Sequence, residues 1–413
     1  MKKCMRKKGV SLIVLVITIV VMIILATAII LALSNGEIIK KANKAKIDTE
    51  AASAKDVVAM AYADWMLDEV KIKQENEEIK TFSNYAEMKL QAAGYKVGIG
   101  ENSYTVTEKG EVYEGLTEGA RTAIISGIEI GQKVKYNTVL TEKSYTTDGS
   151  EQSFTGEADD TKKQTIGTNL SYTWRYIGID EDGNLLIAAD MSKEQKLSLL
   201  RATEGPVDPP VTSSNYKMTL DGKGAYLNGP KMLDTVCDAL YSVEGKGTAK
   251  SINIDIVTKL LEYNGPKGSY TDENRNMIEL TEPITIAQTG LVSELGSSVV
   301  TPDGKDINTY YTNFYPIIKE DTKNRITKDE IKQNLVYQDQ DYWLASACVD
   351  ANFYDHRIYF SVLEVNRNNV YTHPIFLSFN YAESYTNFVR PVVSLNSNVK
   401  LTPNEDKTEW TLS

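Results

Sequence analysis

Cysteine and histidine are scarce in this chain, which has three cysteines and two histidines among 413 residues. Three cysteines do not make the disulfide framework of a small secreted domain, although Cys237 and Cys348 could pair outside a cell. The histidines, His356 and His373, match neither the HxH nor the HExxH spacing of a metal centre. We therefore expect no metal, no cofactor and no enzymatic activity.

Positive charge is also in deficit. Lysine and arginine number 45 against 56 aspartates and glutamates, which gives a net charge of −11 and a sequence pI near 5.0. A nucleic-acid-binding protein needs clustered lysines and arginines to neutralise phosphates. The balance therefore argues against nucleic acid as a partner.

Residues 10–34 contain no charged side chain. As a helix rising 1.5 Å per residue they would extend roughly 37 Å, enough to span a bilayer. Five of the nine preceding residues are basic, and such clusters stay in the cytoplasm. The run is too long for the apolar core of a signal peptide. We expect a single-pass cell-membrane protein whose C-terminal part is extracellular.

Residues 345–388 lack Lys, Gln, Met, Trp and Gly altogether. These 44 residues hold both histidines, five of the eight phenylalanines, six Asn, five Tyr and four Ser. Rigid amphipathic rings combined with short hydrogen-bonding groups are typical of adaptable recognition surfaces. An ordinary tyrosine-rich strand region is the alternative that composition leaves open.

The sequences that flank this stretch are Tyr342-Trp343-Leu344-Ala345-Ser346 and Val389-Arg390-Pro391-Val392-Val393-Ser394-Leu395. Residues 342–395 resemble the end of the C-type-lectin-like domains that bacterial retroelements diversify, which share their fold with formylglycine-generating enzymes. Residues 119–341 resemble the domain body more loosely, through Trp174–Asp180 and Tyr226–Asn228. Phe388 departs from the glycine that the family pattern has before Val389.

The resemblance implies that a variable repeat is rewritten at AAY-type codons. Such codons cannot yield Lys, Gln, Met, Trp or Glu, so only Glu364 and Glu383 would have to be fixed. It also implies a hypervariable binding face for an extracellular protein or glycan. We expect the ligand-binding residues to be exposed in one patch: Asp350, Asn352, Tyr354, Asp355, His356, Tyr359, Ser361, Asn366, Asn368, Tyr371, His373, Asn380, Tyr385 and Asn387.

The segment Lys7-Lys8-Gly9-Val10-Ser11-Leu12-Ile13 resembles a type IV prepilin leader. The resemblance implies a prepilin peptidase as a partner, which would cut after Gly9 and leave Val10 as the first mature residue. Pilins carry Glu at the fifth mature position, where this chain has Val14. A minor pilin or pseudopilin with an adhesive C-terminal domain is the alternative function.

Three further motifs lack residues that their function requires. An EF-hand loop beginning at Asp180 would need Gly at its sixth position, where Leu185 stands, and Glu at its twelfth, where Met191 stands. Glu282-Pro283-Ile284 has Ile284 in place of the calcium-ligand Asn of animal C-type lectins. A formylglycine-type enzyme uses paired catalytic cysteines, and the cysteines of this chain do not match that pair.

We predict an α+β protein: a transmembrane, pilin-like long helix followed by a C-type-lectin-like mixed domain. Its expected parts are a prepilin-like leader, a transmembrane helix, a helical stalk, a small pilin-like α+β unit, a ligand-binding domain with its variable region, and a C-terminal tail. They span residues 1–9, 10–34, 35–79, 80–118, 119–400 (variable region 345–388) and 401–413.

Local patterns predict several elements. Asp180-Glu181-Asp182-Gly183 reads as the turn of a hairpin between 174–179 and 184–189. We expect helices over 85–93, 232–242, 251–263 with Ser251 as cap, and 327–335 with a Thr327–Glu330 capping box. Trp343, Leu344, Val362, Val370 and Val389–Leu395 are expected in the core.

Overall fold

A computed structural model gives the fold. It describes residues 37–75, 78–146, 163–168, 172–190, 196–198, 212–213, 216–217, 223–290, 306–312, 325–338, 340–352, 357–366, 369–373 and 386–413. These residues confirm the mixed α+β class. None of their helices is long and apolar enough to cross a bilayer. The predicted leader and transmembrane segment, 1–9 and 10–34, lie outside the described residues.

The chain divides into two compact units, residues 1–97 with 102–114, and residues 98–101 with 115–413. The first contains α2 (Glu37–Glu75), α3 (Phe82–Ala92), β1 (Lys96–Val97), β2 (Ser103–Val106) and β3 (Val112–Glu114). The segments expected as a separate stalk and a separate small unit therefore belong to one compact unit. Its three strands form one sheet in the order β1-β2-β3.

The long helix α2 packs through one stripe. Ala54, Val58, Ala61 and Trp65 are buried at the three- and four-residue spacing that places side chains on one helix face. They share a core with Phe82, Tyr85 and Leu90 of α3 and with Tyr104 and Val106 of β2. The helix is interrupted at Asp68, whose φ of −138° and ψ of 28° are not helical.

The second unit is built on two seven-stranded sheets. The first runs in the order β12 (Gly247–Ser251), β19 (Pro391–Leu395), β8 (Leu185–Ala189), β7 (Trp174–Ile179), β4 (Lys133–Lys135), β21 (Glu409–Leu412), β20 (Leu401–Pro403). Residues 401–413, expected as a tail, thus complete this sheet, and Trp410 is fully buried. Strand β4, near the start of this unit in the sequence, pairs in parallel with β21, which is the last strand of the chain.

The second sheet runs in the order β14 (Met277–Leu280), β13 (Gly268–Thr271), β15 (Tyr342–Asn352), β16 (Arg357–Asn366), β17 (Asn369–His373). Also on it are β18 (Thr386–Phe388), which pairs with β15, and β9 (Lys196–Ser198), which pairs with β18. Two small ribbons join β5 (Glu142–Thr146) to β6 (Lys163–Gly167), and β10 (Thr212–Ser213) to β11 (Tyr216–Lys217).

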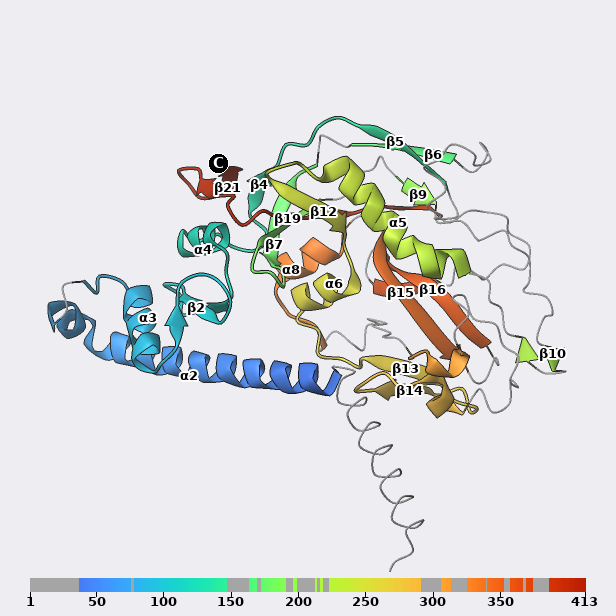
Figure 1. Cartoon of the computed structure of the whole chain (residues 1–413), viewed down its shortest axis with the longest axis horizontal. Helices are drawn as coiled ribbons and strands as arrows, with labels where there is room; N and C mark the ends of the chain where they lie inside the picture. Colours follow the sequence, from blue (N-terminus) through green and yellow to red (C-terminus); the bar gives the residue numbers. More distant parts are fainter. Residues whose placement is uncertain are drawn as a thin grey trace, which may run out of the picture. The chain divides into compact units, whose positions relative to one another are not determined.

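Helices accompany these sheets. They are α4 (Glu118–Ile125), α5 (Lys223–Tyr241), α6 (Ile254–Leu260) and α8 (Glu330–Val336), with short 3-10 turns η3 (Ile286–Thr289) and η4 (Ile307–Thr309). In Figure 1, α5 runs alongside β15 and β16, and it contacts both strands. The predicted helix over 232–242 is therefore the second half of a longer one.

The hairpin around Asp180 is present. Its strands β7 and β8 pair antiparallel, and the Asp180 carboxylate accepts hydrogen bonds from the backbone N–H groups of Asp182 and Asn184. Gly183 has a φ of +78°, and a Cβ there would lie 2.0 Å from the Gly115 carbonyl oxygen. The turn therefore needs glycine for both conformation and space.

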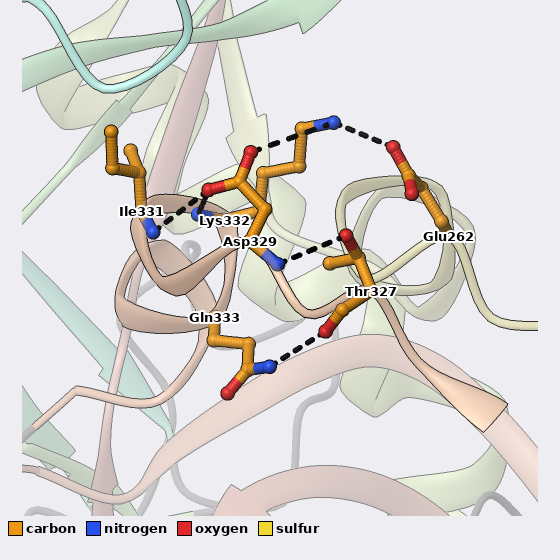
Figure 2. Close-up of polar contacts among 6 residues, drawn as sticks. All are labelled: Glu262, Thr327, Asp329, Ile331, Lys332 and Gln333. Atoms are coloured by element: carbon orange, nitrogen blue, oxygen red, sulfur yellow. Dashed lines mark hydrogen bonds and ion pairs between the residues drawn. The ribbon is translucent and has the colours of Figure 1, made fainter. Parts of the chain in front are cut away.

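Two predicted helix caps are wrong. Ser251 ends strand β12, and Asn253 caps α6 by accepting from Ile256 N–H. Figure 2 shows Asp329, not Thr327, capping α8, since its carboxylate accepts from the N–H groups of Ile331 and Lys332. The Asp329 carboxylate lies two residues closer to the helix than Thr327 and accepts from two N–H groups at its start. The positive N-terminal end of the helix also stabilises its negative charge.

Candidate binding surface on the β15–β17 meander

The stretch from β15 to β17 begins at three fully buried residues, which we call the base together with the buried segment around β19. Tyr342, Trp343 and Leu344 are each 0% exposed, and Tyr342 pairs in parallel with Phe388 of β18. Val389 and the β19 residues Val392, Val393 and Leu395 are buried too. The prediction that both flanks of the segment belong to the core is confirmed.

Arg390 is the exception within this apolar base, because a charged side chain is 0% exposed there. Its Nε donates to the Ala189 carbonyl at 2.9 Å, and its Nη1 donates to the Tyr342 hydroxyl at 3.0 Å. That hydroxyl in turn donates to the Val336 carbonyl at 2.8 Å. The chain of bonds ties β8, β15 and the end of α8 to the start of β19.

The same guanidinium lies over the Tyr342 ring, with its central carbon 5.0 Å from the ring centroid. Burial raises the pKa of Tyr342, and Arg390 opposes that rise. Nη2 of Arg390 has no hydrogen-bond partner among the described residues. The sequence placed residue 390 in the core but gave no sign that it would be a buried cation.

The strands of the meander are paired in a defined register. Asp350 lies opposite Tyr359, and Cys348 lies opposite Ser361. On the next pair, Glu364 lies opposite Tyr371, and Val362 lies opposite His373. The backbone therefore brings candidate residues from three strands into neighbouring positions.

The fourteen candidate residues fall into three groups. Seven lie on the meander: Asp350 and Asn352 on β15, Tyr359, Ser361 and Asn366 on β16, and Tyr371 and His373 on β17. Asn387 lies on β18, opposite Leu197 of β9. The other six lie outside the described residues: Tyr354, Asp355, His356, Asn368, Asn380 and Tyr385. Their exposure and their union in one patch stay predictions.

The middle of β16 is core on both faces. Val362, Leu363, Glu364 and Val365 are consecutive and all at most 4% exposed. Leu363, Val365 and Cys348 of β15 belong to one hydrophobic cluster with residues of α6 and α8. Successive strand residues point to opposite faces, which leaves the other face for α5, the helix that contacts β15 and β16. Val362 is confirmed as core.

Cys237 and Cys348 are both buried and are not joined to each other, so the disulfide left open by the sequence is not formed. Burial raises the pKa of Cys237 well above its usual value, and the Asp234 charge adds to the effect. A thiol held in its protonated form is a poor nucleophile. Among the described residues, no group of three or more His, Cys, Asp or Glu side chains could hold a metal ion.

Comparison of the chain with protein-family models, with curated proteins and with solved structures gives no match.

Proposed function

We propose that this chain is a cell-surface-anchored binding protein whose recognition face is drawn from residues 345–388. Its ligand is an extracellular protein or glycan, and its face is diversified by a retroelement. An N-terminal pilin-like helix over 10–34 anchors it in the membrane. The observation that carries the proposal is the residue content of 345–388, which is rich in Tyr, Asn, Ser and Phe and has no Lys, Gln, Met, Trp or Gly.

The arrangement of the backbone supports it. Recognition loops and strands need a rigid base, and the candidate residues follow directly from a base in which Tyr342, Trp343 and Leu344 are fully buried. The base is also cross-linked by the buried Arg390. Because the middle of β16 is enclosed, the face is confined to the outer parts of the strands, around Asp350 and Tyr359.

Two experiments test the proposal. The first is sequencing of the DNA around the gene, where an adenine-rich near-copy of the codons for 342–395 should lie beside a reverse transcriptase gene. The second compares binding to arrays of glycans and extracellular proteins. Replacing Asp350, Asn352, Tyr359 and Ser361 together by alanine should change the binding profile, whereas replacing the exposed Lys133 and Lys135 of β4 should not. An unchanged profile for both variants would contradict the proposal.

The minor-pilin alternative is favoured by one observation. The 39-residue helix α2 carries a second helix and a three-stranded sheet against one face, as the prepilin resemblance implies. Co-purification of the chain with sheared pilus filaments, together with a pilus assembly operon and no repeat of codons 342–395, would select this function.

A further inference from the structure

A pocket of about 350 Å³ lies beside α8, and none of its lining residues belongs to 345–388. We call it the α8 pocket. Three of its lining residues come from the first sheet and the segments next to it: Gly131 just before β4, Arg175 on β7 and Asp190 just after β8. The rest are Ile331, Asn334, Leu335 and Gln338, at and just after α8. Its volume is in the range of small-molecule sites.

The polar side of the pocket is formed by Arg175 and Asp190, whose positions are set by hydrogen bonds within the protein. Nε of Arg175 donates to Asp190 Oδ2 at 2.6 Å, and Nη1 donates to the Gly131 carbonyl at 2.9 Å. A guanidinium has five N–H donors, so three donors of Arg175 have no partner among the described residues. Both side chains are partly accessible, 31% for Arg175 and 24% for Asp190. A ligand therefore meets donors and a carboxylate oxygen side by side.

The opposite wall is one face of a helix. Ile331, Asn334 and Leu335 follow the three- and four-residue spacing of neighbours on a helix surface, and Gln338 lies two residues after the helix ends. Leu335 is buried and forms an apolar floor, while Ile331 is 57% exposed at the rim. Asn334 is exposed beside it and offers an amide that both donates and accepts.

This wall is anchored at its start. Asp329 caps α8, the Gln333 side chain donates to the Thr327 carbonyl at 2.6 Å, and Lys332 reaches Glu262 just after α6 at 2.6 Å (Figure 2). A lining face on a rigid element holds its groups more accurately than a free loop would.

The charges that line the pocket favour a neutral ligand over an anion. The positive charge of Arg175 is balanced by Asp190 at hydrogen-bond distance, so an anion such as phosphate gains no net attraction there. Hydroxyl groups both donate and accept, which suits a wall of donors beside an acceptor. The C–H face of a sugar ring would cover Ile331 and Leu335. We propose that the α8 pocket binds a neutral polyhydroxylated ligand, a single saccharide unit.

Every lining residue of this site lies outside 345–388, the stretch to which the proposed function assigns the diversified face. Copies of the protein that differ within 345–388 would keep the same saccharide pocket. The protein would then have one constant binding site and one variable one.

The test uses the full-length chain in an amine-oxide detergent, because maltoside detergents would themselves present a sugar. Saturation-transfer NMR and calorimetry would measure D-glucose, D-galactose, D-mannose, N-acetyl-D-glucosamine, glycine and inorganic phosphate at concentrations in the tens of millimolar. At least one neutral sugar should bind, and glycine and phosphate should bind more weakly.

Three variants sharpen the test. Asn334→Leu removes the rim amide at similar volume and should weaken sugar binding about tenfold or more, or about 1.4 kcal/mol. Asp190→Asn leaves Arg175 unbalanced, so it should weaken sugar binding and create phosphate binding. Glu330→Gln lies on the same helix but outside the lining and should change neither. Sugar binding untouched by the first two variants, tighter binding of phosphate or glycine to the wild type, or no binding of any of the four sugars would overturn the proposal.

Discussion

The buried Arg390 permits a sharp prediction, because three substitutions separate its charge from its hydrogen bonds. Its two hydrogen bonds, to the Ala189 carbonyl and the Tyr342 hydroxyl, involve a charged donor and contribute about 1.5–3 kcal/mol each. Against them stands the cost of burying a cation that no carboxylate pairs with among the described residues, which is several kcal/mol. The two terms largely offset each other.

Arg390→Met removes both terms. The Ala189 carbonyl loses its partner, which costs about 1–3 kcal/mol, while the Tyr342 hydroxyl keeps its bond to the Val336 carbonyl. Arg390→Lys keeps the charge buried but loses the planar fork that reaches both acceptors. An undercompensated buried charge costs about 3–5 kcal/mol. We therefore expect methionine to be tolerated better than lysine, and alanine to fall near lysine because it also leaves a cavity.

The assay is urea unfolding of the full-length chain followed by tryptophan fluorescence. The chain has four tryptophans, and Trp65 belongs to the first compact unit, whereas Trp174, Trp343 and Trp410 belong to the second. A Trp65→Phe background therefore restricts the signal to the unit that contains Arg390. If lysine proves more stabilising than methionine at position 390, the charge is compensated in a way that this reasoning omits, and the argument fails.

Further predictions concern topology, processing, packing and pH. Protease added to intact cells should remove the domain beyond residue 119, and full protection would reverse the orientation. Intact mass should show the first nine residues removed, with Val10 at the N-terminus; their retention would leave a simple anchor. Leu344→Ala should cost about 2–5 kcal/mol, whereas alanine at Asp350 and Tyr359 together should stay within about 1 kcal/mol; equal losses in urea unfolding would make both strand positions core. The hydrogen bond from Lys332 lowers the pKa of Glu262, so this ion pair stabilises the fold above the ordinary carboxylate pKa, and the stabilisation is lost as pH falls through the lowered pKa of Glu262. Glu262→Gln should remove this acid dependence of the unfolding free energy in urea titrations. An unchanged dependence would contradict the prediction.

Elements with strong local signals could be predicted from the sequence. The long helix from residue 37, the hairpin at Asp180 and the buried Trp343 and Leu344 all follow from periodicity, turn chemistry or hydrophobicity. In each case the residues that form the element also carry its signal. The physical information is local, so no knowledge of distant segments is needed.

Features that depend on distant segments could not be predicted. The strand β4 pairs with β21, and β12 pairs with β19, although neither pairing has a signature in the strands themselves. The caps at Ser251 and Thr327 were wrong because neighbouring Asn253 and Asp329 suit the position equally well by type. The α8 pocket joins residues from 131 to 338, and no spacing in the sequence links them.

The burial of Glu364 bears on the diversification proposal from an independent direction. The codon argument requires Glu364 to be fixed, because AAY-type codons cannot yield glutamate. The structure buries this side chain to 4% exposure within a run of four consecutive core residues, where close packing makes even one methylene group matter. A substitution at this position would therefore disturb the packing of the scaffold. The proposed codon pattern and the packing thus both call for a constant residue at this position, whereas composition alone would have ranked Glu364 with the polar residues of the stretch.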